Sequence, residues 1–109
     1  MTLLIKRKNG KAIGFLTYER IGKPKHRLFE VIHIVVSSKY RHEGIGTELF
    51  NRLLKKHKWR KIFLTTHASN KGAHKFYEKL GMKMEAVLPN HYYKGEPELV
   101  YSIMNKSKF

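Results

Sequence analysis

The sequence predicts an α/β fold with a mixed sheet, whose elements follow the order β-β-β-α-β-α-β-β. The strongest indication is the run 28–37, which is long, β-branched and nearly continuously apolar, as expected for a central strand buried on both faces. Two segments with helical spacing follow, 44–57 and 70–80, and a second apolar run at 61–66 separates them. A strand, a helix and a strand in this order form a βαβ unit, so the two central strands are expected to be parallel.

A β-hairpin is expected near the N-terminus. Residues 2–7 and 12–18 are short, mostly apolar runs, and Asn9-Gly10 stands between them. Asn-Gly favours a two-residue hairpin turn because both central positions of that turn require positive φ. Gly22-Lys23-Pro24 predicts the turn that leads into the central strand.

Each predicted helix has one apolar face. In the first helix this face consists of Ile45, Leu49, Phe50, Leu53 and Leu54. The side chains expected to face water are Glu48, Arg52, Lys55 and Lys56. In the second helix the apolar face consists of Ala73, Phe76, Tyr77 and Leu80. Ser69 or Asn70 can cap the start of this helix, and Gly81 suits the position just beyond its end.

The C-terminal part predicts a last antiparallel pair of strands. Residues 82–88 and 99–104 read as the two strands, joined by a polar and aromatic loop at 89–97. No repeat or linker interrupts the chain, and a length of 109 residues suits one domain. Residues 1–109 are therefore expected to form a single domain.

The composition excludes several classes of protein. The chain has 23 Lys and Arg against 8 acidic residues, all of them Glu, for a net charge of +15. It has no Cys, which removes disulfide scaffolds, thiolate metal sites and a Cys nucleophile, and the histidines lack metal-ligand spacing, so no metal is expected. No apolar run approaches the ~18 residues of a membrane helix and no signal-peptide pattern is present, so we expect a cytoplasmic protein that does not bind membranes. The charge favours a polyanionic or phosphate-bearing partner, with a solvated lysine-rich surface as the alternative.

The junction between the central strand and the first helix, residues 37–47, is the most informative about function. It reads SSKYRHEGIGT and brings two glycines to the start of the helix. The first amides of a helix are unpaired and lie at the positive end of its dipole, so they attract anions, and Gly44 and Gly46 permit a phosphate to approach the backbone closely. The P-loop and dinucleotide-binding motifs do not match. An ordinary βα turn would also explain the glycines, so the junction alone leaves both interpretations open.

Two motifs resemble one family. Arg41-x-x-Gly44-x-Gly46, after the Val-Val end of the central strand, looks like the acetyl-CoA pyrophosphate motif of the GNAT superfamily of N-acetyltransferases. The segment NKGAHKFYEKLG, residues 70–81, resembles the second helix of that family, which reads Asn-x-x-Ala-x-x-Phe-Tyr-Glu-Lys-Leu-Gly. Met82 departs from the pattern, where Phe is usual. The resemblance covers residues 12–104 and implies a GNAT-like mixed sheet with a central parallel βαβ unit.

The resemblance implies that acetyl-CoA is the co-substrate. Its pantetheine arm would pair with the backbone of residues 34–36 in a gap between the two parallel strands, and its pyrophosphate would bind amides of residues 41–47. Asn70 would hold the arm from the other side, and Ala73 and Phe76 would support it. The cofactor-binding residues implied are Ile34, Val35, Val36, Arg41, His42, Glu43, Gly44, Ile45, Gly46, Thr47, Asn70, Ala73, Phe76 and Tyr77. Glu43 departs from the family, many members of which carry a basic residue there.

Acetyl transfer to an amine needs a base for the ammonium, a polariser for the thioester carbonyl and an acid for the departing thiolate. Glu30 is the expected base, because a carboxylate in a buried strand is costly unless it faces a cleft or a partner, and because burial raises its pKa. Its spacing to Gly44 also resembles that of the catalytic glutamate in the histone-acetylating branch of the family. The alternative is an edge glutamate paired with a lysine.

Four further residues enter the predicted chemistry. By resemblance Tyr77 is the expected acid, with a core aromatic role as the alternative, and the polariser would be a backbone N–H near Val36. His33 and His67 are rival bases. Odd spacing places His33 on the strand face opposite Glu30, and His67 lies beyond the end of its strand.

The acceptor is indicated only by the loop 90–97, NHYYKGEP, which resembles the peptide-gripping hairpin of protein N-terminal acetyltransferases. Tyr92 and Tyr93 are therefore expected to bind a peptide or protein amine, in preference to a small amine. GNAT domains usually begin with a strand and two helices before the first hairpin seen here, so the acceptor site would be open or completed by a second subunit of a homodimer. The hypothesis from a different class is a non-catalytic module that binds acyl-CoA or nucleic acid, although no standard nucleic-acid motif is present.

Overall fold

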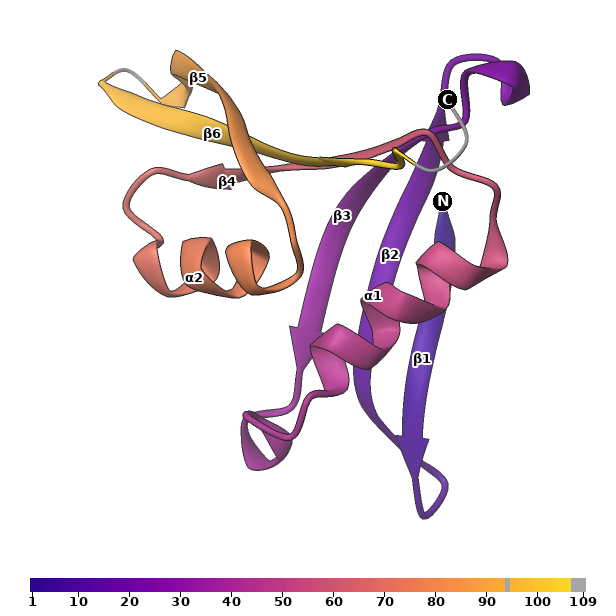
Figure 1. Ribbon diagram of the computed structural model, residues 1–109. Coiled ribbons are helices and arrows are strands. Elements are labelled where there is room, and N and C mark those ends of the chain that lie inside the picture. The colour runs from indigo at the N-terminus through magenta and orange to yellow at the C-terminus, as the bar shows by residue number, and fades with distance from the viewer. Residues whose placement is uncertain (94, 107–109) are drawn as a thin grey trace.

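The computed structural model describes residues 1–93 and 95–106, and residues 90–93 by their backbone alone; it contains one six-stranded sheet and two α-helices (Figure 1). The strands are β1 (Thr2–Lys8), β2 (Lys11–Ile21), β3 (Leu28–Val36), β4 (Lys61–His67), β5 (Lys83–Tyr93) and β6 (Glu96–Met104). The helices are α1 (Ile45–Lys56) and α2 (Lys71–Lys79), with two short 3₁₀ turns, η1 (Pro24–His26) and η2 (Ser38–Tyr40). This order confirms the predicted α/β fold.

The N-terminal hairpin forms as the sequence predicted. Asn9 and Gly10 both have positive φ, 52° and 80°, which is the conformation that a two-residue hairpin turn requires. β1 pairs antiparallel with β2, and β2 continues to pair antiparallel with β3. Both hairpin strands are longer than predicted, since β2 extends to Ile21.

The two central strands are parallel, as predicted, but they pair over only three positions. The strand order is β1-β2-β3-β4-β6-β5, and the paired residues of β3 and β4 are Leu28 with Lys61, Phe29 with Ile62, and Glu30 with Phe63. Beyond these pairs β4 turns away from β3 and continues with β6 (Figure 1). Residues 31–36 of β3 therefore pair with β2 on one side only, and their other edge is open.

The two helices cover different parts of the sheet. α1 packs against β1, β2 and β3, and α2 lies against the half formed by β4, β5 and β6 (Figure 1). The buried core lies beneath α1 and between the two halves of the sheet. It consists of Leu4, Ile13, Leu16, Tyr18, Phe29, Val31, Ile45, Leu49, Phe50, Leu53, Ile62, Leu64, Met82 and Tyr101. None of the helices that the structure describes is long and apolar enough to cross a membrane.

Both ends of α2 carry the predicted caps. Asn70 precedes the helix, and its side-chain oxygen accepts a hydrogen bond of 3.3 Å from the amide of Ala73. Gly81 has a φ of 94°, so the chain leaves the helix in the left-handed conformation that glycine favours. The amide of Met82 donates to the carbonyl of Tyr77 at 3.1 Å, which completes a Schellman motif. These caps fix where α2 begins and ends relative to β4.

A β-bulge in β3 interrupts the alternation of side chains that the sequence analysis assumed. Thr17 of β2 lies opposite His33, whereas the next residue, Tyr18, lies opposite Val31, so Ile32 is an extra residue. The side chains of β3 that face the core are therefore Phe29, Val31, Ile34 and Val36. Glu30 and His33 consequently lie on the same face, and the expectation that odd spacing separates them was wrong.

Two other expectations were also wrong in part. β3 is not buried on both faces, because His33 and Val35 are exposed on the face away from α1, where no described helix covers the sheet. The predicted loop 89–97 is largely strand: β5 continues to Tyr93, and β6 begins at Glu96. The pairing of β5 with β6 is irregular between Leu88 and Tyr93, which interrupts the regular alternation expected of a strand in this segment.

A buried aromatic cluster at the C-terminal end of α1 makes the fold sensitive to acid. Tyr18 Oη and His57 Nε2 are 2.7 Å apart, and the ring of His57 stacks on Phe29 with centroids 4.7 Å apart. Burial, and then the charges of Arg20 and Lys56, hold the pKa of His57 below its ordinary value. Because the unfolded chain then binds the proton more readily, the free energy of unfolding should fall as the pH drops below the ordinary histidine pKa.

We expect urea unfolding between pH 8 and 5 to show this loss, and His57→Gln to make the decline shallower. The variant removes one titrating group and leaves the other histidines in place. A decline of the same steepness in both proteins would show that His57 does not contribute to it.

Candidate functional site

A cleft with a volume of about 590 Å³ lies where β3 ends and α1 begins. It is bounded by the open edge of β3, the turn η2, the first turn of α1 and one face of α2. The lining residues are Ile34, Val35, Val36, Tyr40, Arg41, His42, Gly44, Ile45, Gly46, Thr47, Gly72, Phe76 and Lys79. Most of these lining residues are among the predicted cofactor-binding residues. Sequence analysis did not identify Tyr40, Gly72 and Lys79.

The start of α1 supplies donors to this cleft. Gly44 precedes the helix with a φ of 78°, and no side chain caps the helix there. The carbonyl of Gly44 accepts the first intrahelical hydrogen bond, from the amide of Glu48 at 2.9 Å. The amides of Ile45, Gly46 and Thr47 precede that bond, so they belong to the orphan donors of a helix start and suit an anion.

At the cleft, Gly46 in the first turn of α1 lies against Phe76 of α2. A Cβ at this position would lie 2.8 Å from Cζ of Phe76, closer than side chains approach one another. The absence of a side chain at Gly46 therefore lets Phe76 pack over the first turn of α1, and Phe76 forms the floor of the cleft beside the helix amides. This explains the second glycine of the motif by packing, whereas Gly44 is explained by its positive φ.

The open edge of β3 forms another wall. Because residues 31–36 have no pairing partner on the β4 side, alternate amides and carbonyls along this edge are available to an extended ligand. Val35 is 44% exposed although it sits within a central strand. The cleft thus combines an unpaired strand edge with a bare helix N-terminus.

Not every residue implied by the resemblance lines this cleft. Asn70 and Ala73 are joined by the cap of α2, and Tyr77 packs between α2 and the sheet. Glu43 lines a neighbouring pocket of about 320 Å³, together with Lys6, Arg7, Lys8, Ile13, Gly44, Ile45 and Glu48. The lining of the main cleft does not include Asn70, Ala73, Tyr77 or Glu43.

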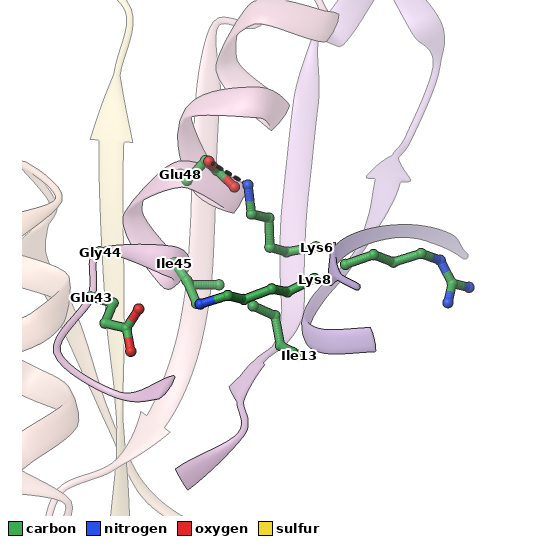
Figure 2. Close-up of a pocket in the computed structure, with 8 residues that line it drawn as sticks. Lys6, Lys8, Ile13, Glu43, Gly44, Ile45 and Glu48 are labelled. Carbon is green, nitrogen blue, oxygen red and sulfur yellow. Dashed lines mark hydrogen bonds and ion pairs between the residues drawn. The ribbon is translucent and has the colours of Figure 1, made fainter. Parts of the chain in front are cut away.

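The neighbouring pocket brings cations close to the same helix start. Lys6 and Glu48 form an ion pair at 3.0 Å, and the side chain of Lys8 extends across the pocket toward Ile45 (Figure 2). The ammonium of Lys8 also lies 5.2 Å from the ring centroid of Tyr40, which lines the main cleft. The positive charge of the N-terminal hairpin is therefore added to that of Arg41 near the helix amides.

Glu30 lies where β3 and β4 begin to separate. It is half-buried and sits opposite Glu19 of β2, and its pairing with Phe63 is the last between the two parallel strands. Burial, and then the negative charge of Glu19, raise the pKa of Glu30 above its ordinary value. No ion pair between Glu30 and a lysine occurs among the described residues, so the alternative of a lysine-paired edge glutamate finds no support.

Tyr77 approaches the separating strands from α2. Its hydroxyl forms a hydrogen bond with Thr66 of β4, and its ring lies 5.7 Å from that of Tyr101. Burial raises the pKa of Tyr77, and the hydrogen bond from Thr66 lowers it by a smaller amount. The phenol is therefore held protonated at neutral pH, as a proton donor must be.

His67 is the last residue of β4 and forms an ion pair with Glu98 of β6, the residue directly opposite it. Glu98 is 3% exposed, and apart from this ion pair its Oε2 has no hydrogen-bond partner among the described residues. His67 thus compensates a buried carboxylate. Among the described residues no group of three or more side chains suits a metal ion.

The two predicted acceptor-binding residues, Tyr92 and Tyr93, lie at the end of β5. Their backbone belongs to β5, but their side chains lie outside the part of the chain that the structure describes. The expectation that they bind the acceptor stays a prediction.

The fold and the cleft define a class of protein, an α/β protein whose sheet opens beside a helix N-terminus to admit an extended anionic ligand. A known protein family matches this class. The family model described as Acetyltransferase (GNAT) family matches residues 1–82. The chain belongs to the GNAT family.

Similar proteins agree with this assignment. A protein described as an uncharacterized N-acetyltransferase from Methanocaldococcus jannaschii is 34% identical over 86 residues, which cover 73% of this chain and 38% of that protein. A GNAT family acetyltransferase from Elizabethkingia anophelis, whose structure holds acetyl-CoA, has a TM-score of 0.82 at 19% identity, covering 94% of this chain and 75% of its own.

The ribosomal-protein-S18-alanine N-acetyltransferase from Escherichia coli has a TM-score of 0.79 at 22% identity, covering 99% of this chain and 73% of its own. At these identities the two structures show the shared fold. The chain spans well under half the length of the curated relative from Methanocaldococcus jannaschii.

Proposed function

We propose that the protein is an acetyl-CoA-dependent N-acetyltransferase that transfers the acetyl group directly to a primary amine. The observation that carries this proposal is the cleft of about 590 Å³ in which the open edge of β3 meets the bare N-terminus of α1. Coenzyme A has an extended amide-bearing arm joined to a pyrophosphate. The cleft offers a complementary feature to each part, at one continuous surface.

The chain provides the contacts in a definite order. The backbone of Ile34, Val35 and Val36 pairs with the amides of the arm, in the manner of an added strand. The amides of residues 45–47 and the guanidinium of Arg41 hold the pyrophosphate. Phe76 supports the arm from α2. Acetyl-CoA supplies a thioester, which is an activated acyl group, so no covalent enzyme intermediate is needed.

The proton transfers are assigned to two side chains. The carboxylate of Glu30 accepts a proton from the acceptor ammonium, which frees the nitrogen lone pair for attack on the thioester carbonyl. The hydroxyl of Tyr77 donates its proton to the sulfur as the carbon–sulfur bond breaks, and the resulting tyrosinate takes up the proton that the nitrogen loses as the amide forms. Burial raises the pKa of both groups, which makes the Glu30 carboxylate a stronger proton acceptor and keeps the Tyr77 phenol protonated.

The proposed acceptor is a peptide or protein amine. The face of the sheet that carries Glu30 also presents the exposed side chains of His33 and Val35, which offer a peptide a surface beside the proposed base. The E. coli neighbour of the same fold acts on a ribosomal protein by its printed name. The choice of acceptor is tested separately from catalysis, by comparing peptides with free N-termini, polyamines and small amines.

The proposed function is tested by calorimetry with acetyl-CoA and by a thiol-release assay with that amine panel. We expect binding and an amine-dependent release of free coenzyme A. A folded protein with no affinity for acetyl-CoA or coenzyme A would refute the proposal. Binding without release for every amine would favour the non-catalytic module instead.

Arg41 gives a test of the pyrophosphate contact. We expect Arg41→Ala to weaken the binding of coenzyme A about tenfold or more, because a hydrogen bond between charged groups contributes about 1.5–3 kcal/mol. Lys25→Ala is the matched control, since it removes one charge from the exposed turn η1, away from the cleft. Equal affinity losses in the two variants would mean that Arg41 acts through net charge and not through contact.

A further inference from the structure

We propose that His33 is a proton-transfer residue of the reaction, which takes the proton from Glu30 and releases it to solvent. This inference rests on the proposed acetyltransferase function. It begins from the bulge at Ile32, which turns His33 onto the face of the sheet that carries Glu30. Bulges next to active sites commonly re-aim a side chain in this way.

The register on β2 gives the spacing of Glu30 and His33 along the sheet. Glu30 is opposite Glu19 and His33 is opposite Thr17, and these two residues of β2 are consecutive positions on one face. Consecutive same-face positions in a strand are about 7 Å apart along the strand. A carboxylate and an imidazole attached at that spacing are within reach of a single bridging water or of direct contact.

The ring of His33 is oriented by its neighbour on β2. His33 Nδ1 lies 3.0 Å from the hydroxyl of Thr17. When Nδ1–H donates to this hydroxyl, the free lone pair is on Nε2, which can then accept a proton. His33 is exposed, so Nε2 can exchange with solvent. Thr17 is a positioning residue in this arrangement.

The proposed base and His33 share one face of the sheet. The carboxylates beside His33 on this face are Glu30 on its own strand and Glu19 on β2, and Lys61 of β4 lies on the same face, where it pairs with Glu85. A proton that reaches Glu30 therefore has Nε2 of His33 as a neighbouring acceptor.

The step balances without any further reactant. The acceptor ammonium gives one proton to the Glu30 carboxylate, which becomes a carboxylic acid. This acid gives the proton to Nε2 of His33, which becomes an imidazolium. The imidazolium loses the proton to water or buffer, and both groups return to their starting state for the next turnover.

The test is steady-state kinetics of His33→Gln in dilute buffer, with and without added imidazole. We expect kcat to fall about tenfold, KM for acetyl-CoA to stay unchanged, and imidazole to restore much of the lost rate, because a small base replaces the missing side chain. Thr17→Val should lower kcat less, and Thr17→Ser, which keeps the hydroxyl, should retain the parent rate. His26→Gln, in the turn η1, is the matched histidine control.

The outcomes separate this inference from the proposed function. An active parent enzyme whose His33→Gln variant has the same kcat, at low and high buffer, overturns the role of His33 alone. A loss in His33→Gln that imidazole does not restore indicates a structural effect and also overturns it. A parent protein that binds acetyl-CoA but acetylates no amine refutes the proposed function, and this inference with it.

Discussion

Glu30→Gln should lower kcat with the preferred amine by about 10²- to 10⁴-fold, while the affinity for acetyl-CoA remains that of the parent. Glutamine keeps the size and polarity of the side chain but cannot accept a proton from the ammonium. The measurement is thiol release at saturating substrates, together with calorimetry for binding. A variant with full activity would remove Glu30 from the mechanism.

The same substitution should not harm the fold, which makes the kinetic result easy to interpret. The pKa of Glu30 is raised in the folded protein, so the folded state disfavours the charged form. The stability that Glu30 contributes when protonated is lost as the pH rises through its folded pKa. At neutral pH, Glu30→Gln should therefore hold or slightly raise the melting temperature.

Glu19→Gln is the matched comparison for this experiment. It removes the negative charge opposite Glu30 and so removes one of the two causes of the raised pKa. The acid limb of the pH–rate profile, which reports protonation of the base, should then move to lower pH. An acid limb that does not move would mean that another group sets it.

His67→Ala should destabilise the protein by about 2 kcal/mol, because it leaves the carboxylate of Glu98 buried without its ion-pair partner. We place the loss at the low end for such pairs because the side chain of His67 is 46% exposed and solvent screens it. Urea unfolding at pH 7 measures the effect.

A double-mutant cycle tests this explanation. Glu98→Gln removes the buried charge, so adding His67→Ala to Glu98→Gln should cost much less than His67→Ala alone. Equal costs in the two backgrounds would show that His67 stabilises the end of β4 by packing and not by pairing with Glu98.

The parts of the fold that were predictable are those fixed by local chemistry. Asn9 and Gly10 determine their turn by positive φ, and Asn70 and Gly81 determine the ends of α2 by capping. The motif around Gly44 and Gly46 lies at the cleft, but the helix start alone left an ordinary βα turn open, and the resemblance to the GNAT family supplied the prediction of a cofactor site. At the hairpin turn and at the ends of α2, a few neighbouring residues determine the backbone conformation.

The parts that were missed depend on segments far apart in the chain. The bulge at Ile32 adds one residue without changing the apolar character of β3, so the alternation of side chains could not be read from the sequence. Tyr40 lines the cleft because of the turn η2, and Lys79 lines it because of how α2 packs. Residue spacing along the sequence predicts neither arrangement. Glu98 gave no signal at all, since its partner His67 lies on another strand.

The divergence of β3 and β4 has a consequence for how the protein behaves in the cell. The unpaired edge of β3, in the middle of the sheet, resembles an exposed edge strand, which tends to pair with extended segments of other chains. A ligand that pairs with this edge stabilises the folded state by mass action. The cellular concentration of acetyl-CoA should therefore set how well the protein resists heat and proteolysis. A fall in the acetyl-CoA concentration would then reduce the amount of folded protein as well as its catalytic rate.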